Sequence, residues 1–290
     1  MNKKINAAVF PVAGLGSRFL PATKATPKEM LPIVDKPLIQ YAVEEAVEAG
    51  IKKMIFVTGR NKRAIEDHFD SAYELEAELA LKEKHDLLAI AHSVAPKGVD
   101  FVYVRQSTAL GLGHAILCAK PALSDEPFAV LLADDLIKSS KGAVQQLIMA
   151  NDGSDRPIIG LEKIQPYQTR AYGVISIRES MGQYVIASDL VEKPKAEDAP
   201  SNLGVVGRYI LPYEIFDVIE HLPNGSGGEI QLTDALAVLA RRDGVIGVLL
   251  EGRRFDCGSK FGFAQANIEY GLEHPEIGEN LKSYLKKLIV

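Results

Sequence analysis

The chain has 290 residues, of which 47% are hydrophobic and 24% charged, a balance typical of a soluble globular protein. Its formal net charge of −5 argues against general nucleic-acid binding, which needs a basic face. No apolar run approaches the roughly 20 residues that a membrane span requires. We therefore expect a cytoplasmic protein that binds neither nucleic acid nor membrane. Its length suits one large α/β domain or two small ones.

Strand-like and helix-like segments alternate in the first half of the chain. Short runs rich in β-branched and aromatic residues predict strands at 7–10, 54–58, 101–104 and 128–132. Helical periodicity predicts helices between them at 38–49 and 113–119. Alternation of this kind is typical of a mostly parallel sheet covered by helices on both faces. The charged amphipathic segment 71–84 is expected to be a solvated excursion.

After about residue 155 the strand-like runs follow one another more closely, which predicts an antiparallel addition to the same sheet. These runs are residues 157–161, 173–177, 184–187 and 203–209. A helix at 230–241, a strand at 245–250 and a helical tail from about 261 to 289 complete the chain. Because there is no Pro/Ser-rich linker and no internal repeat, we predict one continuous domain over residues 1–290.

A glycine-rich segment, Ala13-Gly14-Leu15-Gly16-Ser17-Arg18, follows the first predicted strand. A strand that ends in such a turn exposes consecutive backbone N–H groups, which form a concave anion site. Arg18 adds a planar fork of donors matched to phosphate oxygens, and Lys28 adds a compact second cation. Together these features predict a site for a polyphosphate, most simply a nucleotide.

The same loop partly matches the Gly-x-Gly-x-x-Gly fingerprint of dinucleotide-binding proteins, which is a weak pattern on its own. Phe19 stands at the third glycine position, where close helix–strand packing needs Gly or Ala. Pro21 and Pro27 interrupt the helix that should follow. Asp35 lies about where a ribose-binding acid would fall, but in a loop-like segment. We therefore favour the polyphosphate site.

Acidic residues follow two predicted strands. Asp134 and Asp135 come directly after the strand at 128–132, at the edge where ligands bind in open α/β sheets. A carboxylate facing a polyphosphate there is a natural ligand for Mg²⁺, although Asp134 could instead cap a turn. Asp256 follows the last predicted strand and is a second candidate, with a turn-forming aspartate as the alternative. Two acids from separate strand ends could coordinate one ion beside the reacting phosphate.

A candidate for base recognition lies after the strand at 101–104. The Gln106 amide has a donor and an acceptor side by side, which can read the edge of a pyrimidine. Gly111 would let the backbone approach a base closely. His114 is equally compatible with a packed, satisfied side chain, so we assign it no catalytic role.

A candidate for sugar recognition is the run Glu192-Lys193-Pro194. A carboxylate accepts hydrogen bonds from two neighbouring hydroxyls, and the lysine could hold a sugar phosphate. Neighbours in a regular strand point to opposite faces, but Pro194 disfavours regular pairing there. The alternative for an isolated run of this kind is a surface turn.

The sequences of these motifs resemble the signature of the sugar-nucleotide pyrophosphorylases, also called sugar-1-phosphate nucleotidyltransferases. Within that family they are most similar to the bacterial UTP–glucose-1-phosphate uridylyltransferase branch. The similar segments are 12–18, 27–32, 200–209 and 227–234, and the matches extend from residue 9 to about residue 271. One departure is Ala133, where relatives often have Gly or Pro before the acid. It should not remove a ligand.

The resemblance implies a Rossmann-like mixed, mostly parallel sheet flanked by helices, with antiparallel additions in the second half and a C-terminal helical tail. It implies Mg²⁺-dependent transfer of a uridylyl group from UTP to α-D-glucose 1-phosphate, giving UDP-glucose and pyrophosphate. Residues 1–155 would mainly bind the nucleotide and 156–257 the sugar. Residues 258–290 would form the tail, available for subunit contacts in a homo-oligomer, a dimer or tetramer.

The resemblance also implies a set of site residues. Its members are catalytic Arg18, Lys28 and Lys193; nucleotide-binding Ala13, Gly14, Gly16, Glu29, Gln106 and Gly111; sugar-binding Asp135, Gly173, Glu192, Lys193 and Val206; and metal-binding Asp134 and Asp256. Glu29 either contacts the nucleotide or orders its loop. No general base is needed, because the second pKa of a sugar phosphate, about 6, leaves it mostly dianionic near neutral pH.

Two other functions share parts of this set. A thymidylyltransferase making dTDP-glucose would use most of the same residues. A non-catalytic sugar-nucleotide sensor could keep the fold, but it would not need both the metal-binding acids and the cations that hold the leaving group.

Overall fold

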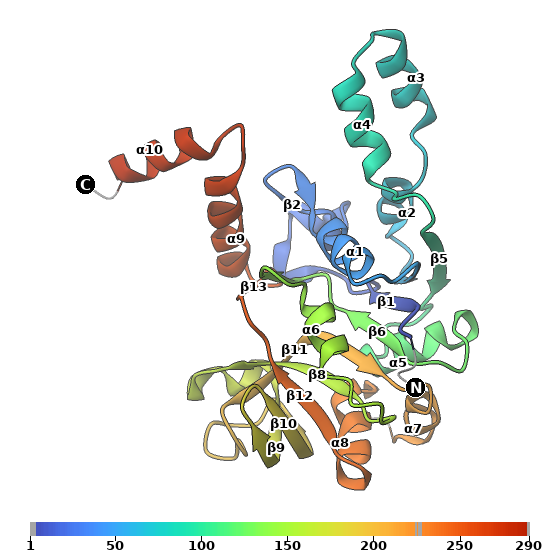
Figure 1. The fold of residues 1–290 in the computed structure, drawn as a ribbon, viewed down its shortest axis with the longest axis vertical. Coiled ribbons are helices and arrows are strands. Elements are labelled where there is room, and N and C mark those ends of the chain that lie inside the picture. The colour runs from blue at the N-terminus through green and yellow to red at the C-terminus, as the bar shows by residue number, and fades with distance from the viewer. Residues whose placement is uncertain (1–3, 224, 226–227, 289–290) are drawn as a thin grey trace.

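The computed structural model describes residues 4–223, 225 and 228–288, and the fold is drawn in Figure 1. Within these residues nine strands form one sheet, in the order β5-β4-β1-β6-β11-β8-β12-β10-β9. Their bounds are β1 Ala7–Pro11, β4 Lys53–Thr58, β5 Asp100–Arg105, β6 Phe128–Leu131, β8 Ile158–Lys163, β9 Gly173–Met181, β10 Tyr184–Glu192, β11 Leu203–Leu211 and β12 Val245–Leu249. Two small ribbons, β2–β3 (Pro32–Ile33, Lys36–Pro37) and β7–β13 (Asp135–Lys138, Arg253–Asp256), lie outside this sheet.

Helices cover both faces of the sheet, as the alternating pattern predicts (Figure 1). The helices are α1 Leu38–Glu48, α2 Arg63–Phe69, α3 Tyr73–Leu81, α4 His85–Ser93, α5 Leu112–Ala119, α6 Ala143–Met149, α7 Ile215–His221, α8 Leu232–Arg242, α9 Lys260–Glu273 and α10 Gly278–Leu288. Short 3-10 turns occur at Ser17–Phe19, Ala22–Lys24, Lys28–Met30, Lys120–Ala122 and Pro166–Ala171.

The alternation of side chains along each strand divides the core in two. In β1, Ala7 and Val9 pack on one face, whereas Ala8 and Phe10 pack on the other. The first face is covered by α5, α7 and α8, and the second by α1, α2 and α6. Because these strands are apolar on both faces, they must lie between two helical layers.

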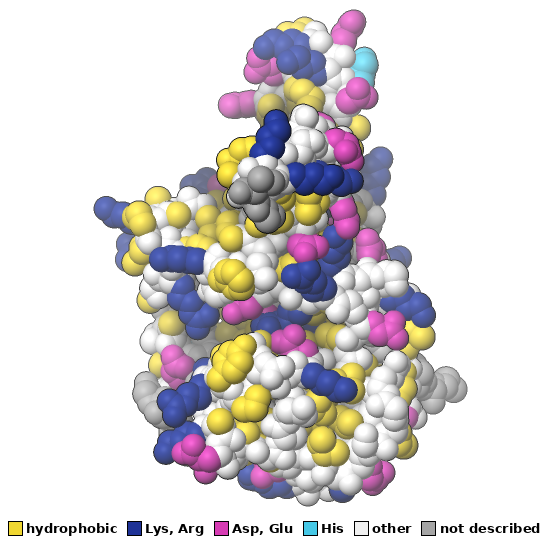
Figure 2. All heavy atoms as spheres, turned by 90° about the vertical axis from the view of Figure 1, so that its left-hand side faces the viewer, with side chains coloured by type: hydrophobic (Ala, Val, Ile, Leu, Met, Phe, Trp, Pro, Cys, Tyr) yellow, Lys and Arg dark blue, Asp and Glu magenta, His cyan; other side chains and the backbone are white. Residues whose placement is uncertain are grey.

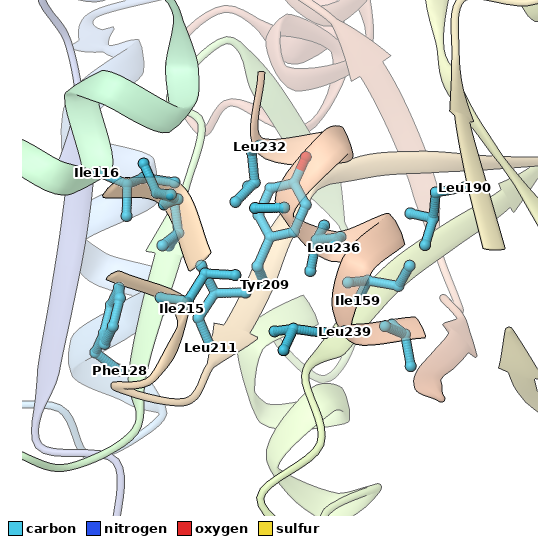
Figure 3. Close-up of a cluster of buried hydrophobic side chains, with 14 of the residues drawn as sticks. Ile116, Phe128, Ile159, Leu190, Tyr209, Leu211, Ile215, Leu232, Leu236 and Leu239 are labelled. Carbon is cyan, nitrogen blue, oxygen red and sulfur yellow. The ribbon is translucent and has the colours of Figure 1, made fainter. Parts of the chain in front are cut away.

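The core under α8 joins the two halves of the chain. Figure 3 shows buried side chains of β11, α5, α7 and α8 meeting there: Ile116, Tyr209, Leu211, Ile215, Leu236 and Leu239. Ile116 and Leu239 are 0% and 1% exposed, although they come from opposite halves of the sequence. The hydrophobic effect therefore holds the two halves together along this face of the sheet.

The strand pairing agrees with the prediction in both halves of the chain, except that β12 lies parallel to β8. β5, β4, β1 and β6 are all parallel. β11 is antiparallel to β6 and β8, and β10 is antiparallel to β9 and β12, but β12 lies parallel to β8. The expected mixed sheet with an antiparallel addition in the second half is thus confirmed, although parallel pairs do not predominate in the sheet as a whole.

The predicted C-terminal helical tail is confirmed and consists of two helices, α9 and α10. His274 ends α9 in an extended conformation, with φ −69° and ψ 131°. Pro275 follows it, and a residue before proline is forced out of the helical region. α10 then turns away from the body of the molecule (Figure 1).

The charged segment after residue 70 forms a projecting helical hairpin, α3 and α4 (Figure 1). Neither helix has a buried residue, which agrees with the expected solvated excursion. In the described part of the chain, no helix combines the length and apolar character needed to cross a membrane.

Candidate functional site

A cleft of about 450 Å³ lies beyond the carboxyl end of β6. Seven of the predicted site residues line it: Arg18, Asp134, Asp135, Gly173, Glu192, Lys193 and Asp256. The cations Arg170 and Arg254 line it as well. On the face seen in Figure 2, a hollow crosses the middle of the molecule and side chains of both charges lie along it.

The glycine-rich loop borders a second cavity of about 300 Å³, lined by Ala13, Gly14 and Leu15 on one side and by residues 59–62 on the other. Gly14 and Leu15 are exposed. Within the described residues, the N–H groups of residues 14–17 donate no hydrogen bond to protein. They remain available to an anion, as the sequence predicts.

The loop is shaped by Gly16 and by contacts with the segment that follows it. Gly16 has φ 68°, a left-handed conformation that favours glycine. Its carbonyl accepts a hydrogen bond from Thr23 Oγ1 at 2.7 Å. A Cβ at Gly16 would come within 3.3 Å of Lys28 Cβ, so the lysine lies directly against the loop.

Lys28 and Asp134 form an ion pair, with Nζ 2.6 Å from Oδ2. Burial would raise the pKa of Asp134, but the charge and hydrogen bond of Lys28 leave that pKa below its usual value. Burial would likewise lower the pKa of Lys28, and attraction to Asp134 and Glu29 raises it instead. Both groups are therefore charged at neutral pH.

The carboxylates of Asp134 and Asp256 converge on the space beside Gly258. A Cβ placed on Gly258 would lie 2.9 Å from Asp134 Oδ2, 3.0 Å from Asp256 Oδ1 and 3.4 Å from Arg18 Nη1. Hard divalent cations such as Mg²⁺ take oxygen ligands of this kind. The residues present therefore fit a divalent cation. Because Gly258 has no side chain, it does not fill the space beside the two carboxylates.

The β7–β13 ribbon brings the two acids together, and sequence reasoning missed it. Asp135 pairs with Asp256 in this ribbon, and Cys257 N–H donates to the Asp134 carbonyl at 2.8 Å. Leu136 and Phe255 are buried in its small core. Each strand has only four residues, too few to give a clear alternating pattern.

Asp256 also forms the turn that the alternative interpretation predicts. Its Oδ1 accepts the Gly258 N–H at 3.0 Å, and its carbonyl accepts Ser259 Oγ at 2.9 Å. Ser259 in turn caps α9 by accepting the Gly262 N–H at 3.0 Å. The start of α9 is thus built onto the Asp256 backbone.

Asp135 lines the cleft, yet both of its carboxylate oxygens already have protein partners. Oδ2 accepts the Gly207 N–H at 2.6 Å, and Oδ1 accepts Arg254 Nε at 2.8 Å. Its predicted role as a sugar contact would compete with these bonds. The structure gives Asp135 a part in ordering the cleft.

Arg254 is given no role by the sequence analysis, and the structure makes it the centre of a network. Besides Asp135 it binds Glu162 Oε1 at 2.7 Å and the Tyr172 hydroxyl at 2.6 Å. Burial would lower the pKa of Arg254, but Asp135 and Glu162 raise it. Only the arrangement of β8, β13 and the loop before β9 reveals this partnership.

The predicted sugar residues Gly173, Glu192 and Lys193 line the same cleft. Glu192 Oε2 accepts the Thr233 hydroxyl at 2.6 Å, and Oε1 pairs with Lys193 Nζ at 2.9 Å. A Cβ at Gly173 would come within 3.2 Å of Thr233 Oγ1 and 3.4 Å of Glu192 Oε2. Glycine therefore keeps these oxygens accessible, and Thr233 joins the site as a residue that the sequence did not single out.

Lys193 has φ 48°, a left-handed conformation that is uncommon for a residue with a side chain. Its N–H donates to the Tyr172 carbonyl at 2.9 Å, and Thr169 Oγ1 donates to the Pro194 carbonyl at 2.9 Å. These bonds fix the turn after β10. Because the strand ends at Glu192, the side chains of Glu192 and Lys193 both line the cleft.

Gln106 and Gly111 lie together but outside the residues that line the main cleft. The Gln106 side chain is 7% exposed, and its Nε2 donates to the Gly111 carbonyl at 3.2 Å and to His114 Nδ1 at 2.9 Å. His114 thus orients Gln106. Gly111 has φ 95°, and a Cβ there would lie 2.7 Å from the Ile230 carbonyl oxygen. The absence of a side chain at Gly111 thus allows the backbone to approach Ile230 closely in this structure.

Glu29 is buried next to Lys28 in the chain and does not line the cleft. It is 2% exposed and pairs with Lys62 Nζ at 2.6 Å, while its Oε1 has no hydrogen-bond partner among the described residues. Burial raises the pKa of Glu29, against the opposing charges of Lys62 and Lys28. This position favours the loop-ordering role over direct nucleotide contact.

Val206 is 1% exposed and lines a small separate cavity with Leu161 and Leu250, whereas its neighbours Val205 and Gly207 line the cleft. A sugar contact at Val206 would have to come from its backbone. Of the motif at 227–234, Gly227 lies outside the described residues.

Similarity to known proteins extends along most of the chain. A family model described as nucleotidyl transferase matches residues 8–271. A UTP–glucose-1-phosphate uridylyltransferase of Bacillus subtilis (strain 168) is 49% identical over 289 residues, covering 100% of this chain and 97% of the relative. A solved UDP-glucose pyrophosphorylase from Acinetobacter baumannii has a TM-score of 0.91 at 45% identity, covering 98% of this chain and 100% of that one. A UTP-bound structure from that organism also has a TM-score of 0.91, at 44% identity and the same coverage. The chain therefore belongs to the nucleotidyl transferase family, among the bacterial UTP–glucose-1-phosphate uridylyltransferases.

Proposed function

We propose that this protein transfers the uridylyl group of UTP to α-D-glucose 1-phosphate, releasing pyrophosphate and forming UDP-glucose. One observation carries the proposal: a single cleft is lined both by Arg18 with two convergent acids and by Glu192, Gly173 and Lys193. The first group suits a polyphosphate, and the second suits a sugar phosphate.

The reaction needs alignment and charge neutralisation more than proton transfer. A phosphate oxygen of glucose 1-phosphate attacks the α-phosphorus of UTP in line with the leaving pyrophosphate, and the bond from the α-phosphorus to the bridging oxygen breaks. The attacking phosphate is already mostly dianionic near neutral pH, which removes the need for a general base. The chain must overcome repulsion between the two anions.

Each residue has a matching task. The N–H groups of the glycine-rich loop and Arg18 hold the triphosphate, and Lys28 adds positive charge beside Asp134. Glu192 and Gly173 fix the hexose, and Lys193 holds its phosphate. Asp134 and Asp256 would hold Mg²⁺, which when bound neutralises charge on the reacting phosphate. The helical tail is proposed to serve subunit contacts in a homo-oligomer.

The function is tested by supplying the purified protein with Mg²⁺, glucose 1-phosphate and, in turn, UTP, dTTP, ATP, GTP and CTP, and by measuring pyrophosphate release. UTP should give the highest kcat/KM. Preference for dTTP would make the protein a thymidylyltransferase, and no release with any nucleotide would favour the sensor.

Base selection is expected to depend on Gln106. Replacing it by alanine should raise KM for UTP and narrow the preference for UTP over the other nucleotides, because the change removes the amide oxygen proposed to meet the base, together with the hydrogen bond by which Nε2 holds the Gly111 carbonyl. KM for glucose 1-phosphate should change less. Gln145→Ala, at an exposed position on α6, is the control. Unchanged discrimination among nucleotides in Gln106→Ala would place base recognition elsewhere.

The sugar end separates into two tasks. Glu192→Gln should mainly weaken hexose recognition and reduce discrimination between glucose and its epimers. Lys193→Met keeps the aliphatic stem and removes the charge, so it should lower kcat about 10-fold or more as well as affinity for glucose 1-phosphate. Lys195→Met is the matched control on the same loop, where Lys195 is 62% exposed. Steady-state kinetics with both substrates varied measure these effects, and normal kinetics in Lys193→Met would reduce Glu192-Lys193-Pro194 to a surface turn.

A further inference from the structure

We propose that Arg208 is a positioning residue for the Asp134 carboxylate, acting from beneath the cleft through the main-chain carbonyls on either side of it. The inference deepens the proposed function, since it rests on Asp134 as a ligand of the divalent cation. Arg208 lies in β11 opposite Leu131 of β6, is 1% exposed and does not line the cleft.

The guanidinium of Arg208 binds both ends of the turn that carries Asp134. Nη1 donates to the Leu132 carbonyl at 3.0 Å and to the Gly207 carbonyl at 2.9 Å. Nη2 donates to the Asp135 carbonyl at 2.8 Å. The segment between Leu132 and Asp135 contains only Ala133 and Asp134, so the position of the carboxylate follows from these two anchors.

Glu45 of α1 holds the guanidinium in this orientation. Its Oε2 accepts Arg208 Nη2 at 2.8 Å and its Oε1 accepts Nε at 3.0 Å, a two-pronged pairing that fixes the plane of the group. Glu45 Oε1 also accepts the Val144 N–H at the start of α6 at 2.9 Å. The Arg208 guanidinium is therefore held by Glu45 of α1, which is itself held by the start of α6 on the same face of the sheet.

A purely structural role would not require this pair. Buried ion pairs contribute little net stability, and well-packed apolar residues of similar volume often serve as well. An arginine also differs from lysine here, because only a planar group with five donors can bind Glu45 and three carbonyls together. The arrangement suits a residue that fixes the geometry of the metal-binding turn.

The test measures binding of Mn²⁺ alone, followed by electron paramagnetic resonance, beside the Mg²⁺ dependence of kcat. Arg208→Lys keeps a positive charge for Glu45 but loses the fork. It should weaken Mn²⁺ binding at least 10-fold and raise the Mg²⁺ concentration needed for half-maximal rate by a similar factor. A double variant, Arg208→Gln with Glu45→Gln, removes both charges together and gives the same readout should the lysine variant not fold.

Phe216→Leu is the control for lost stability, because Phe216 is fully buried in α7, on the opposite face of the sheet from Glu45. It should lower Tm yet bind Mn²⁺ as the unaltered protein does. Arg208 variants that fold and bind Mn²⁺ normally would overturn the inference. If the unaltered protein and Asp134→Asn bind Mn²⁺ equally, the proposed metal site itself fails, which distinguishes the two outcomes.

Discussion

Replacing Asp134 by asparagine is expected to lower kcat about 100-fold or more, equivalent to about 3 kcal/mol of transition-state stabilisation. The amide keeps the shape of the side chain but removes the negative charge that would hold the cation. It also leaves the largely buried Lys28 ammonium without its 2.6 Å ion-pair partner. Initial rates at saturating substrates, measured over a range of Mg²⁺ concentrations, give the effect.

A matched control separates this loss from a general change in charge. Asp67→Asn removes an aspartate that is 63% exposed and pairs only with Arg63 on α2 among the described residues, so its kcat should be unchanged. Near-normal turnover of Asp134→Asn at limiting Mg²⁺ would remove Asp134 from the metal-binding role.

The second large effect is expected from Gly262→Ala at the start of α9. A Cβ at Gly262 would lie 2.1 Å from the Asp256 carbonyl oxygen and 2.7 Å from its carbonyl carbon, so main chain must move. The helix propensity gained, about 1 kcal/mol, is smaller than the cost of forcing apart packed backbone, about 3 kcal/mol. The shift falls on Asp256, and we therefore expect a lower Tm together with a fall in kcat.

Gly271→Ala in the same helix is the control. Its Cβ would meet Leu281 Cδ2 at 2.7 Å, the end of a side chain that can change rotamer. This variant should keep its kcat and lose little stability. Thermal unfolding and steady-state rates of both variants decide the point, and equal behaviour of the two would show that the start of α9 does not position Asp256.

Local pattern in the sequence was enough to predict most of the sheet and the turn formed by the glycine-rich loop. β1, β4 and β6 are short, continuous apolar runs. A strand of this kind is buried on both faces, so the pattern alone predicts helices on both sides of the sheet. The glycine-rich loop and Arg18 are consecutive in the sequence, so their proposed role as an anion site could be predicted without knowledge of the fold. The position of Asp134 at the carboxyl edge of the sheet could be predicted too, because this residue comes shortly after β6.

What the sequence did not determine depends on residues far apart along the chain. Asp134 and Asp256 meet through the β7–β13 ribbon, which pairs segments more than 100 residues apart with four residues in each strand. Arg254, Arg208 and Glu45 are ordinary charged residues in the sequence, and their partners lie on other strands or helices. A buried charge is stable only where the fold supplies its partner, so its role is decided by the tertiary structure.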